Sequence, residues 1–81
     1  MNYEASILEV LARSVPNLVR ELALRNRLEL EMGVTVSLAF LSFRLRGLEA
    51  SGDIIAVDNQ DTGTKWTISD KGKARLAAAR E

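Results

Sequence analysis

The chain has 81 residues, of which 47% are hydrophobic and 27% are charged, proportions typical of a small folded domain rather than a disordered chain. It contains neither cysteine nor histidine, which excludes disulfides, thiolate and imidazole catalysis and the usual zinc ligand sets. Eleven basic residues balance eleven acidic ones. The net charge therefore gives no indication of an anionic partner, and any such partner depends on where the charges lie.

The sequence has no apolar run close to the roughly 20 residues that a membrane helix needs. Residues 1–10, MNYEASILEV, also lack the basic start and cleavage pattern of a signal peptide. We therefore expect a cytoplasmic protein with no membrane partner. The length favours a single domain over residues 1–81.

Two helices are predicted in the first part of the chain. The first covers residues 2–14, and its buried side carries apolar residues at helical spacing: Tyr3, Ile7, Leu8 and Leu11. The second covers residues 16–32, because Pro16 suits the first turn of a helix and Gly33 suits a left-handed C-cap. Its predicted buried stripe consists of Leu18, Val19 and Leu22.

A third helix is predicted over residues 37–51, after a short extended stretch. Its core face has residues spaced four, three, four and three apart: Val34, Leu38, Leu41, Leu45 and Leu48. Gly52 ends this helix, and a β-branched strand over residues 53–58 follows at once. A polar turn at 59–63 and a second strand at 64–69 complete a hairpin. Ser69 is the expected cap of a last helix over residues 70–81, in which Leu76 is the one leucine.

Two motifs around the hairpin resemble those of PadR-like and MarR-like transcriptional regulators. The first has the pattern L-x-x-L-E-x-x-G-hydrophobic and comprises Leu45, Leu48, Glu49, Gly52 and Ile54. The second has the pattern aromatic-x-hydrophobic-T-x-x-G-basic and comprises Trp66, Ile68, Ser69, Gly72 and Lys73. The resemblance covers about half of the chain well. It implies an α+β fold, the winged helix-turn-helix, with a three-helix core, a β-hairpin wing and a short C-terminal helix.

This resemblance implies buried positions and a function. We expect burial of five residues: Leu41, Leu45, Leu48, Ile54 and Trp66. The implied function is that of a small sequence-specific DNA-binding transcriptional regulator whose third helix enters the major groove of double-stranded DNA. Because residues 70–81 provide only about three turns, we do not expect dimerisation through a long C-terminal helix of the PadR type.

Candidate DNA contacts lie on the third helix and on the wing. Serines can donate to phosphates or bases, arginines can bind guanine, apolar groups can contact thymine methyls, and a wing lysine can contact the DNA backbone. The candidates are Ser37, Phe40, Ser42, Arg44, Arg46, Thr64 and Lys65. Further basic residues could compensate for an acidic wing tip or could simply be solvated: Arg20, Arg25, Arg27, Lys71, Lys73 and Arg75.

A second apolar stripe on the third helix leaves alternatives open. It lies opposite the leucine stripe and comprises Val36, Phe40, Phe43 and Gly47. Either the phenylalanines belong to the core, or they contact thymine methyl groups, or they bury against a second chain in a weak homodimer. Together with the zero net charge and the two aspartates of the wing tip, this stripe favours an alternative function as a protein-interaction module without DNA binding.

We do not expect an enzyme, a metal site or an organic cofactor. Asp58, Asp61 and Asp70 near the hairpin could form a carboxylate pair, but turns and helix caps use aspartate routinely for local hydrogen bonds. The sequence also contains no glycine-rich phosphate loop and no HExxH or GxSxG motif.

Overall fold

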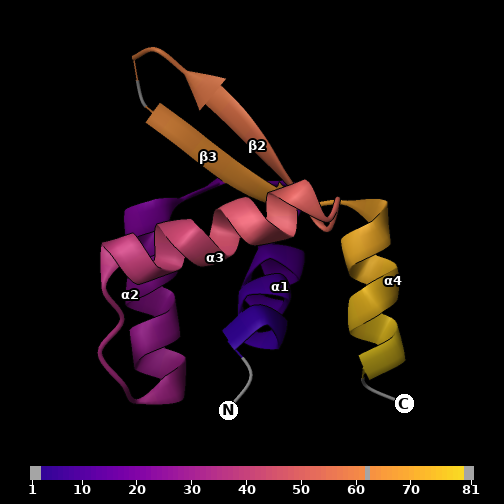
Figure 1. Cartoon of the computed structure of the whole chain (residues 1–81), viewed down its shortest axis with the longest axis horizontal. Helices are drawn as coiled ribbons and strands as arrows, with labels where there is room; N and C mark the ends of the chain where they lie inside the picture. Colours follow the sequence, from indigo (N-terminus) through magenta and orange to yellow (C-terminus); the bar gives the residue numbers. More distant parts are fainter. Residues whose placement is uncertain (1–2, 62, 80–81) are drawn as a thin grey trace.

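The computed structural model describes residues 3–61 and 63–79 and has the predicted α+β architecture. Its elements, in chain order, are α1 (Tyr3–Ser14), β1 (Val19–Arg20), α2 (Glu21–Met32), α3 (Leu38–Ala50), β2 (Ile54–Asn59), β3 (Gly63–Ile68) and α4 (Asp70–Ala79). In Figure 1, α1 lies between α2 and α4, α3 crosses in front, and the β2–β3 hairpin extends away from the helices. Asn2, Thr62 and the last two residues of the predicted final helix lie outside the described residues.

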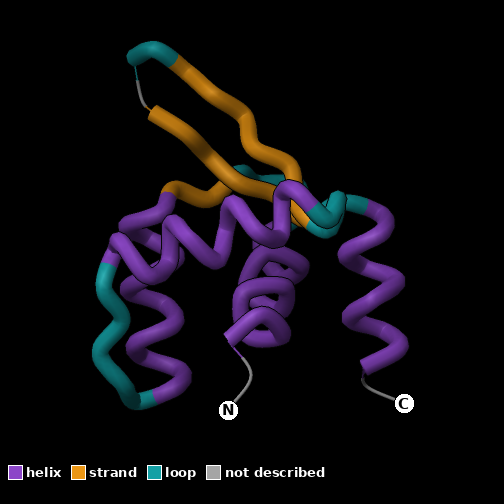
Figure 2. Tube along the Cα trace, in the orientation of Figure 1, coloured by secondary structure: helices purple, strands orange, loops and turns teal. Residues whose placement is uncertain are grey.

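The hairpin belongs to a three-stranded antiparallel sheet in the order β1-β3-β2 (Figure 2). Its strands pair from Ile54 with Ile68 to Asn59 with Gly63, within one residue of the predicted bounds. Strand β1 was not predicted. It has only two residues, too few for a periodic pattern, and it exists because Val19 pairs with Trp66 and Arg20 with Lys65.

The prediction for the second helix was wrong at its start. Helix α2 begins at Glu21, and Pro16 lies in the turn that follows α1. Arg20 has extended dihedrals, φ −77° and ψ 153°, because its backbone pairs with β3. Leu18 and Leu22 are consequently exposed rather than buried, whereas Val19 packs against the core. The buried residues of α2 are Leu24 and Leu28.

One hydrophobic core lies between the helices and the sheet. The predicted burial is confirmed for five residues, each at most 2% exposed: Leu41, Leu45, Leu48, Ile54 and Trp66. In α1, Ile7, Leu8 and Leu11 are buried as predicted, and Tyr3 is partly buried against the core. Helix α4 adds Leu76 to this core.

The start of α3 differs from the predicted pattern. Ser37 caps the helix, since its Oγ accepts a hydrogen bond from the Phe40 N–H at 3.1 Å, so residues before it do not follow helical spacing. Val36 was assigned to the outer stripe but is buried, with its N–H donating to Glu29 Oε2 at 2.8 Å. Leu38 was assigned to the core face but is 41% exposed. Thus the predicted core face holds at Val34, which packs partly buried against the core, and again from Leu41 onward.

The junction between α3 and β2 is a tight, glycine-dependent cap. Gly52 has φ +86° and donates to Glu49 O, while the Asp53 N–H donates to Leu48 O, both at 3.0 Å. These two bonds form a Schellman motif, which satisfies carbonyls at the helix end and needs a residue with positive φ. The predicted role of Gly52 is confirmed. The cap turns the chain directly into the hairpin without a longer loop.

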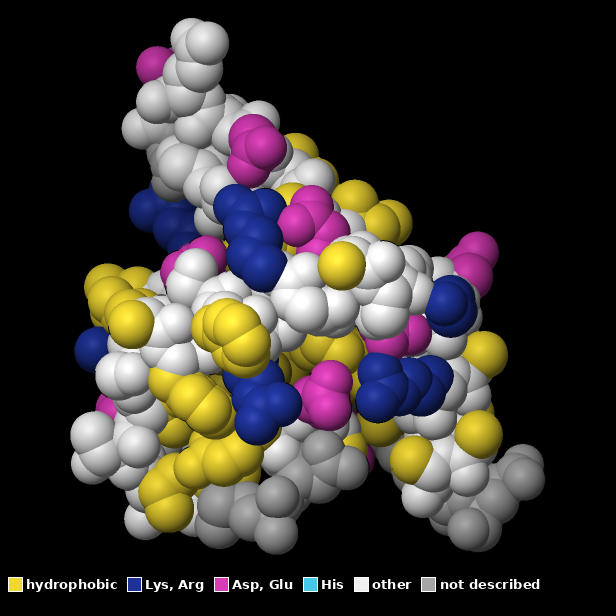
Figure 3. Space-filling view, in the orientation of Figure 1, with side chains coloured by type: hydrophobic (Ala, Val, Ile, Leu, Met, Phe, Trp, Pro, Cys, Tyr) yellow, Lys and Arg dark blue, Asp and Glu magenta, His cyan; other side chains and the backbone are white. Residues whose placement is uncertain are grey.

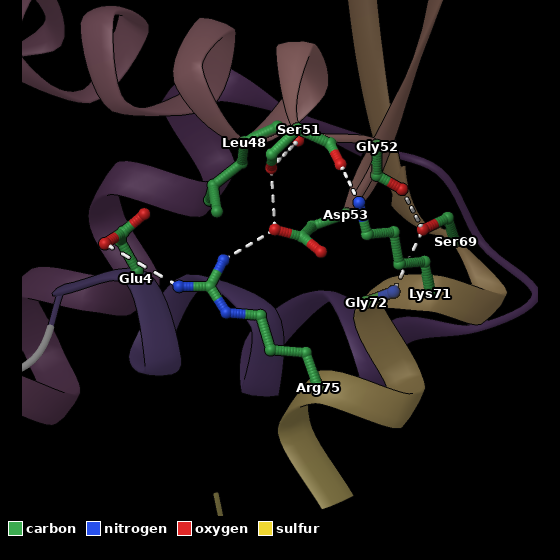
Figure 4. Close-up of polar contacts among 9 residues, drawn as sticks. All are labelled: Glu4, Leu48, Ser51, Gly52, Asp53, Ser69, Lys71, Gly72 and Arg75. Carbon is green, nitrogen blue, oxygen red and sulfur yellow. Dashed lines mark hydrogen bonds and ion pairs between the residues drawn. The ribbon is translucent and has the colours of Figure 1, made fainter. Parts of the chain in front are cut away.

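Polar contacts join this junction to α4 (Figure 4). The Asp53 side chain is 3% exposed, and its Oδ2 accepts hydrogen bonds from Ser51 Oγ at 2.7 Å and from Arg75 at 2.5 Å. As predicted, Ser69 caps α4: its Oγ accepts from the Gly72 N–H at 3.0 Å, and its own N–H donates to Asp53 O. Helix α4 is therefore held in place by a buried carboxylate as well as by Leu76.

Candidate nucleic-acid interface

Helix α3 presents a mostly apolar face to the solvent. After the buried residues are set aside, the exposed positions of this helix are Leu38, Ala39, Phe40, Phe43, Arg46, Gly47 and Ala50. Figure 3 shows hydrophobic side chains gathered over α2 and the adjoining end of α3, and basic side chains at the base of the hairpin. Arg46 is the one charged residue among these exposed α3 positions.

The two phenylalanines of α3 have different environments. Phe43 is 75% exposed, so of the three alternatives left open for it, a place in the core is excluded. Phe40 is 37% exposed, and its ring lies 5.1 Å from that of Tyr3 in an edge-to-face contact. The Arg44 guanidinium lies over the Phe40 ring, 5.2 Å from its centroid, in a cation–π contact. Phe40 thus connects α3 to α1, whereas Phe43 projects into the solvent.

The Arg46 side chain reaches from α3 to strand β3 of the hairpin, where it lies over Trp66. Its guanidinium is 5.1 Å from the centroid of the Trp66 ring and 2.9 Å from Glu49 Oε1. The hydrogen bond with Glu49 raises the pKa of Arg46 above its ordinary value, with smaller contributions from Asp58 and Glu21. The side chain remains 54% exposed, so its ion pair contributes little stability and is readily exchanged for another anion.

Thr64 and Lys65 occupy successive positions of β3 in the wing. Thr64 pairs with Asp58 across the hairpin, and its Oγ1 donates a hydrogen bond to Asp58 Oδ1 at 2.7 Å. Lys65 is paired with Val57 on one side and with Arg20 on the other. Because directly paired residues share a face of the sheet, Arg20 and Lys65 form a basic pair opposite the Trp66 side. Sequence reasoning placed Arg20 on a helix and could not bring it beside Lys65.

The other candidate residues of α3 and the hairpin either have local structural roles or are partly buried. Ser37 is the N-cap of α3, and Ser42 and Arg44 are half-buried on the flanks of the helix. The aspartates near the hairpin have local roles of the kind expected: Asp58 accepts from Thr64, and Asp61 donates its N–H to Asn59 Oδ1. DNA contact by Ser37, Phe40, Ser42, Arg44, Arg46, Thr64 and Lys65 stays a prediction.

Neither a metal-binding cluster nor a membrane-spanning helix is present within residues 3–61 and 63–79. In this part of the chain, no three acidic side chains gather in a way that could hold a metal ion. Among the helices described, none combines the length and the apolar character that a membrane crossing requires.

The fold is similar to that of several solved transcriptional regulators, whereas no protein-family model and no curated protein sequence matches the chain. RosR of H. salinarum superposes with a TM-score of 0.86 at 19% identity, over 98% of this chain and 69% of that chain. A protein of Thermoplasma acidophilum assigned as a transcriptional regulator gives a TM-score of 0.75 at 20% identity, over 90% of this chain and 72% of that one. PadR of Bacillus subtilis, solved in complex with operator DNA, superposes with a TM-score of 0.75 at 20% identity, over 93% of this chain.

These comparisons define the fold as a PadR-like winged helix-turn-helix, as the motifs in the sequence implied. The chain spans 66% of RosR in one complex structure and 45% of the PadR chain. The similarity is thus to the winged-helix part of longer proteins.

Proposed function

We propose that this chain is a sequence-specific DNA-binding transcriptional regulator in which α3 enters the major groove and the hairpin lies along the backbone. The observation that carries the proposal is the superposition on PadR in complex with operator DNA over 93% of this chain. In winged helix-turn-helix proteins, the helix at the position of α3 is the one that contacts base edges.

The charges of α3 agree with this proposal. The segment from Leu38 to Gly47 contains two arginines and no acidic residue, and the first turn of α3 has no acidic residue, unlike those of α1, α2 and α4. The positive end of the helix dipole is therefore not neutralised by a side chain of its own first turn. A polyanion can approach this end of α3 without meeting a carboxylate on the helix.

Lysine substitutions on two elements test the proposed orientation of the wing. If Lys65 contacts a phosphate, Lys65→Ala should weaken duplex binding and reduce the slope of log K against log salt by about 0.9. Lys73→Ala on α4 removes the same charge from an exposed position and should leave the slope unchanged. Binding is measured by fluorescence anisotropy on a duplex that the purified protein selects from a random-sequence pool. Equal slopes for the two variants would contradict the proposed wing contact, and failure to select any duplex would contradict the function.

The exposure of Phe43 favours a second candidate function, a protein-interaction module without DNA binding that self-associates weakly through this ring. Burying one Phe43 from each of two subunits contributes about 3 to 6 kcal/mol, against an association cost of at least about 4 kcal/mol. We therefore expect a weak homodimer detectable only at high protein concentration. Light scattering over a concentration series should show a rising mass for the wild-type chain and a constant monomer for Phe43→Ser. A wild-type chain that stays monomeric at millimolar concentration would contradict self-association.

A further inference from the structure

We propose that Phe43 recognises thymine by contact with its 5-methyl group, so that the centre of α3 selects A·T pairs by apolar contact rather than by hydrogen bonds. This inference rests on the proposed DNA-binding function and names the feature of the duplex that the helix would select.

The outer face of α3 lacks free hydrogen-bonding side chains at its centre. Ala39, Phe43, Gly47 and Ala50 follow one another at helical spacing, and all four are exposed. The polar side chains of this region face other groups: Ser37 caps the helix, Arg44 lies over Phe40, and Arg46 lies over Trp66 and bonds to Glu49. Arg46 remains exposed beside this row, but Ala39, Phe43, Gly47 and Ala50 themselves offer no side-chain group that could hydrogen-bond to a base.

The chemistry of the major groove then favours one base. Guanine, adenine and cytosine present only hydrogen-bond donors and acceptors there, whereas thymine also presents a methyl group. A phenyl ring placed against a polar base edge would leave that edge desolvated without a partner, which costs free energy. A ring placed against a thymine methyl buries two apolar groups together. Phe43, at 75% exposed, has the free surface for this contact.

The residues beside Phe43 allow close approach of the helix to the bases. Gly47 lies inside α3, where glycine is disfavoured relative to alanine by about 1 kcal/mol. Apart from its chain neighbours and the nearby backbone of its own helix, no described atom lies within 4 Å of the position that a Cβ at residue 47 would occupy, so packing against the rest of the chain does not require this glycine. Together with Ala39 and Ala50, it leaves the Phe43 ring as the largest projection on this face. The ring would therefore reach the groove floor before its neighbours do.

Replacing thymine with deoxyuridine tests this contact, because deoxyuridine pairs identically but lacks the methyl group. The probe is the duplex that the purified full chain selects from a random-sequence pool, resynthesised with single thymine-to-deoxyuridine replacements. At one or more positions we expect about fourfold weaker binding, the loss associated with one buried methyl group. The Phe43→Ala variant should bind thymine and deoxyuridine duplexes equally at those positions. Leu30→Ala, which removes an equally exposed apolar side chain from α2, should retain the fourfold difference.

The outcomes separate this inference from the function on which it rests. If the protein selects no duplex, the DNA-binding function fails and the inference fails with it. If it binds a selected duplex but tolerates deoxyuridine everywhere, or if Phe43→Ala keeps the difference, the function stands and the thymine contact is overturned. Circular dichroism of each variant verifies that its fold is intact.

Discussion

Gly72→Ala should destabilise the fold by about 3 kcal/mol or more, the upper range for forcing an extra carbon into packed structure. A Cβ at residue 72 would lie 2.1 Å from Asp53 O and 2.8 Å from Ile68 Cγ1. The first of these atoms is a backbone oxygen of the residue immediately before β2, so it cannot move away as a flexible side chain would. Helix α4 must instead shift and lose its cap on Ser69 and its ion pair with Asp53. Because a domain of this size has only about 4 to 12 kcal/mol of total stability, this loss is large.

Gly47→Ala provides a matched control on another helix. The added methyl group meets no atom of another element within 4 Å, and alanine favours helix, so we expect stability to rise by about 0.5 to 1 kcal/mol. Urea denaturation followed by circular dichroism measures both variants. A Gly72→Ala protein as stable as the wild type would show that α4 does not dock as described.

Asp53→Asn should cost about 2 kcal/mol at neutral pH, the range for hydrogen bonds to a charged group, and the cost should vanish in acid. Hydrogen bonding by Ser51, and then by Arg75, lowers the pKa of Asp53 below its ordinary value, and this effect outweighs the opposing effect of burial. A carboxylate whose pKa is lower in the folded state contributes stability that is complete above its unfolded pKa of about 3.9. That contribution is lost as the pH falls through the lower, folded pKa.

The measurement compares the unfolding free energies of the wild type and Asp53→Asn from pH 7 down to pH 2. We expect the difference between them to be constant above about pH 5 and to shrink below it. Asp70→Asn is the control, because Asp70 is fully exposed and its ion pair with Lys73 is 4.0 Å long. A difference that stays constant down to pH 2 would mean that Asp53 does not contribute through its charge.

Local patterns were sufficient to predict the part of the fold that depends on residues close in sequence. The spacing of Leu41, Leu45 and Leu48 gave the buried face of α3, and Gly52 and Ser69 gave the helix cap on either side of the hairpin. The spacing of the leucines and the hydrogen bonds of the two caps each involve residues only a few positions apart in the sequence. Helix periodicity and capping chemistry therefore identify them without knowledge of the rest of the chain.

The chemical environment of the candidate interface depended on contacts between distant residues. Arg20 became part of a strand only because β3 offered it a pairing edge, and Arg46 lies over Trp66, twenty positions further along the chain. The spacing of Phe40 and Phe43 made them equivalent members of one stripe, yet Tyr3 of α1 covers Phe40 and leaves Phe43 exposed.

The sequence by itself thus determined the order of the four helices and the hairpin, though not β1, together with the leucine core of α3 and the caps, because these follow from backbone geometry and local periodicity. Only the tertiary structure decided which side chains at the interface are free, which are covered, and how a buried Asp53 holds α4 beside the hairpin. The physical reason is that burial, stacking and pairing across strands arise from elements that approach one another in space. Their positions along the chain do not specify that approach.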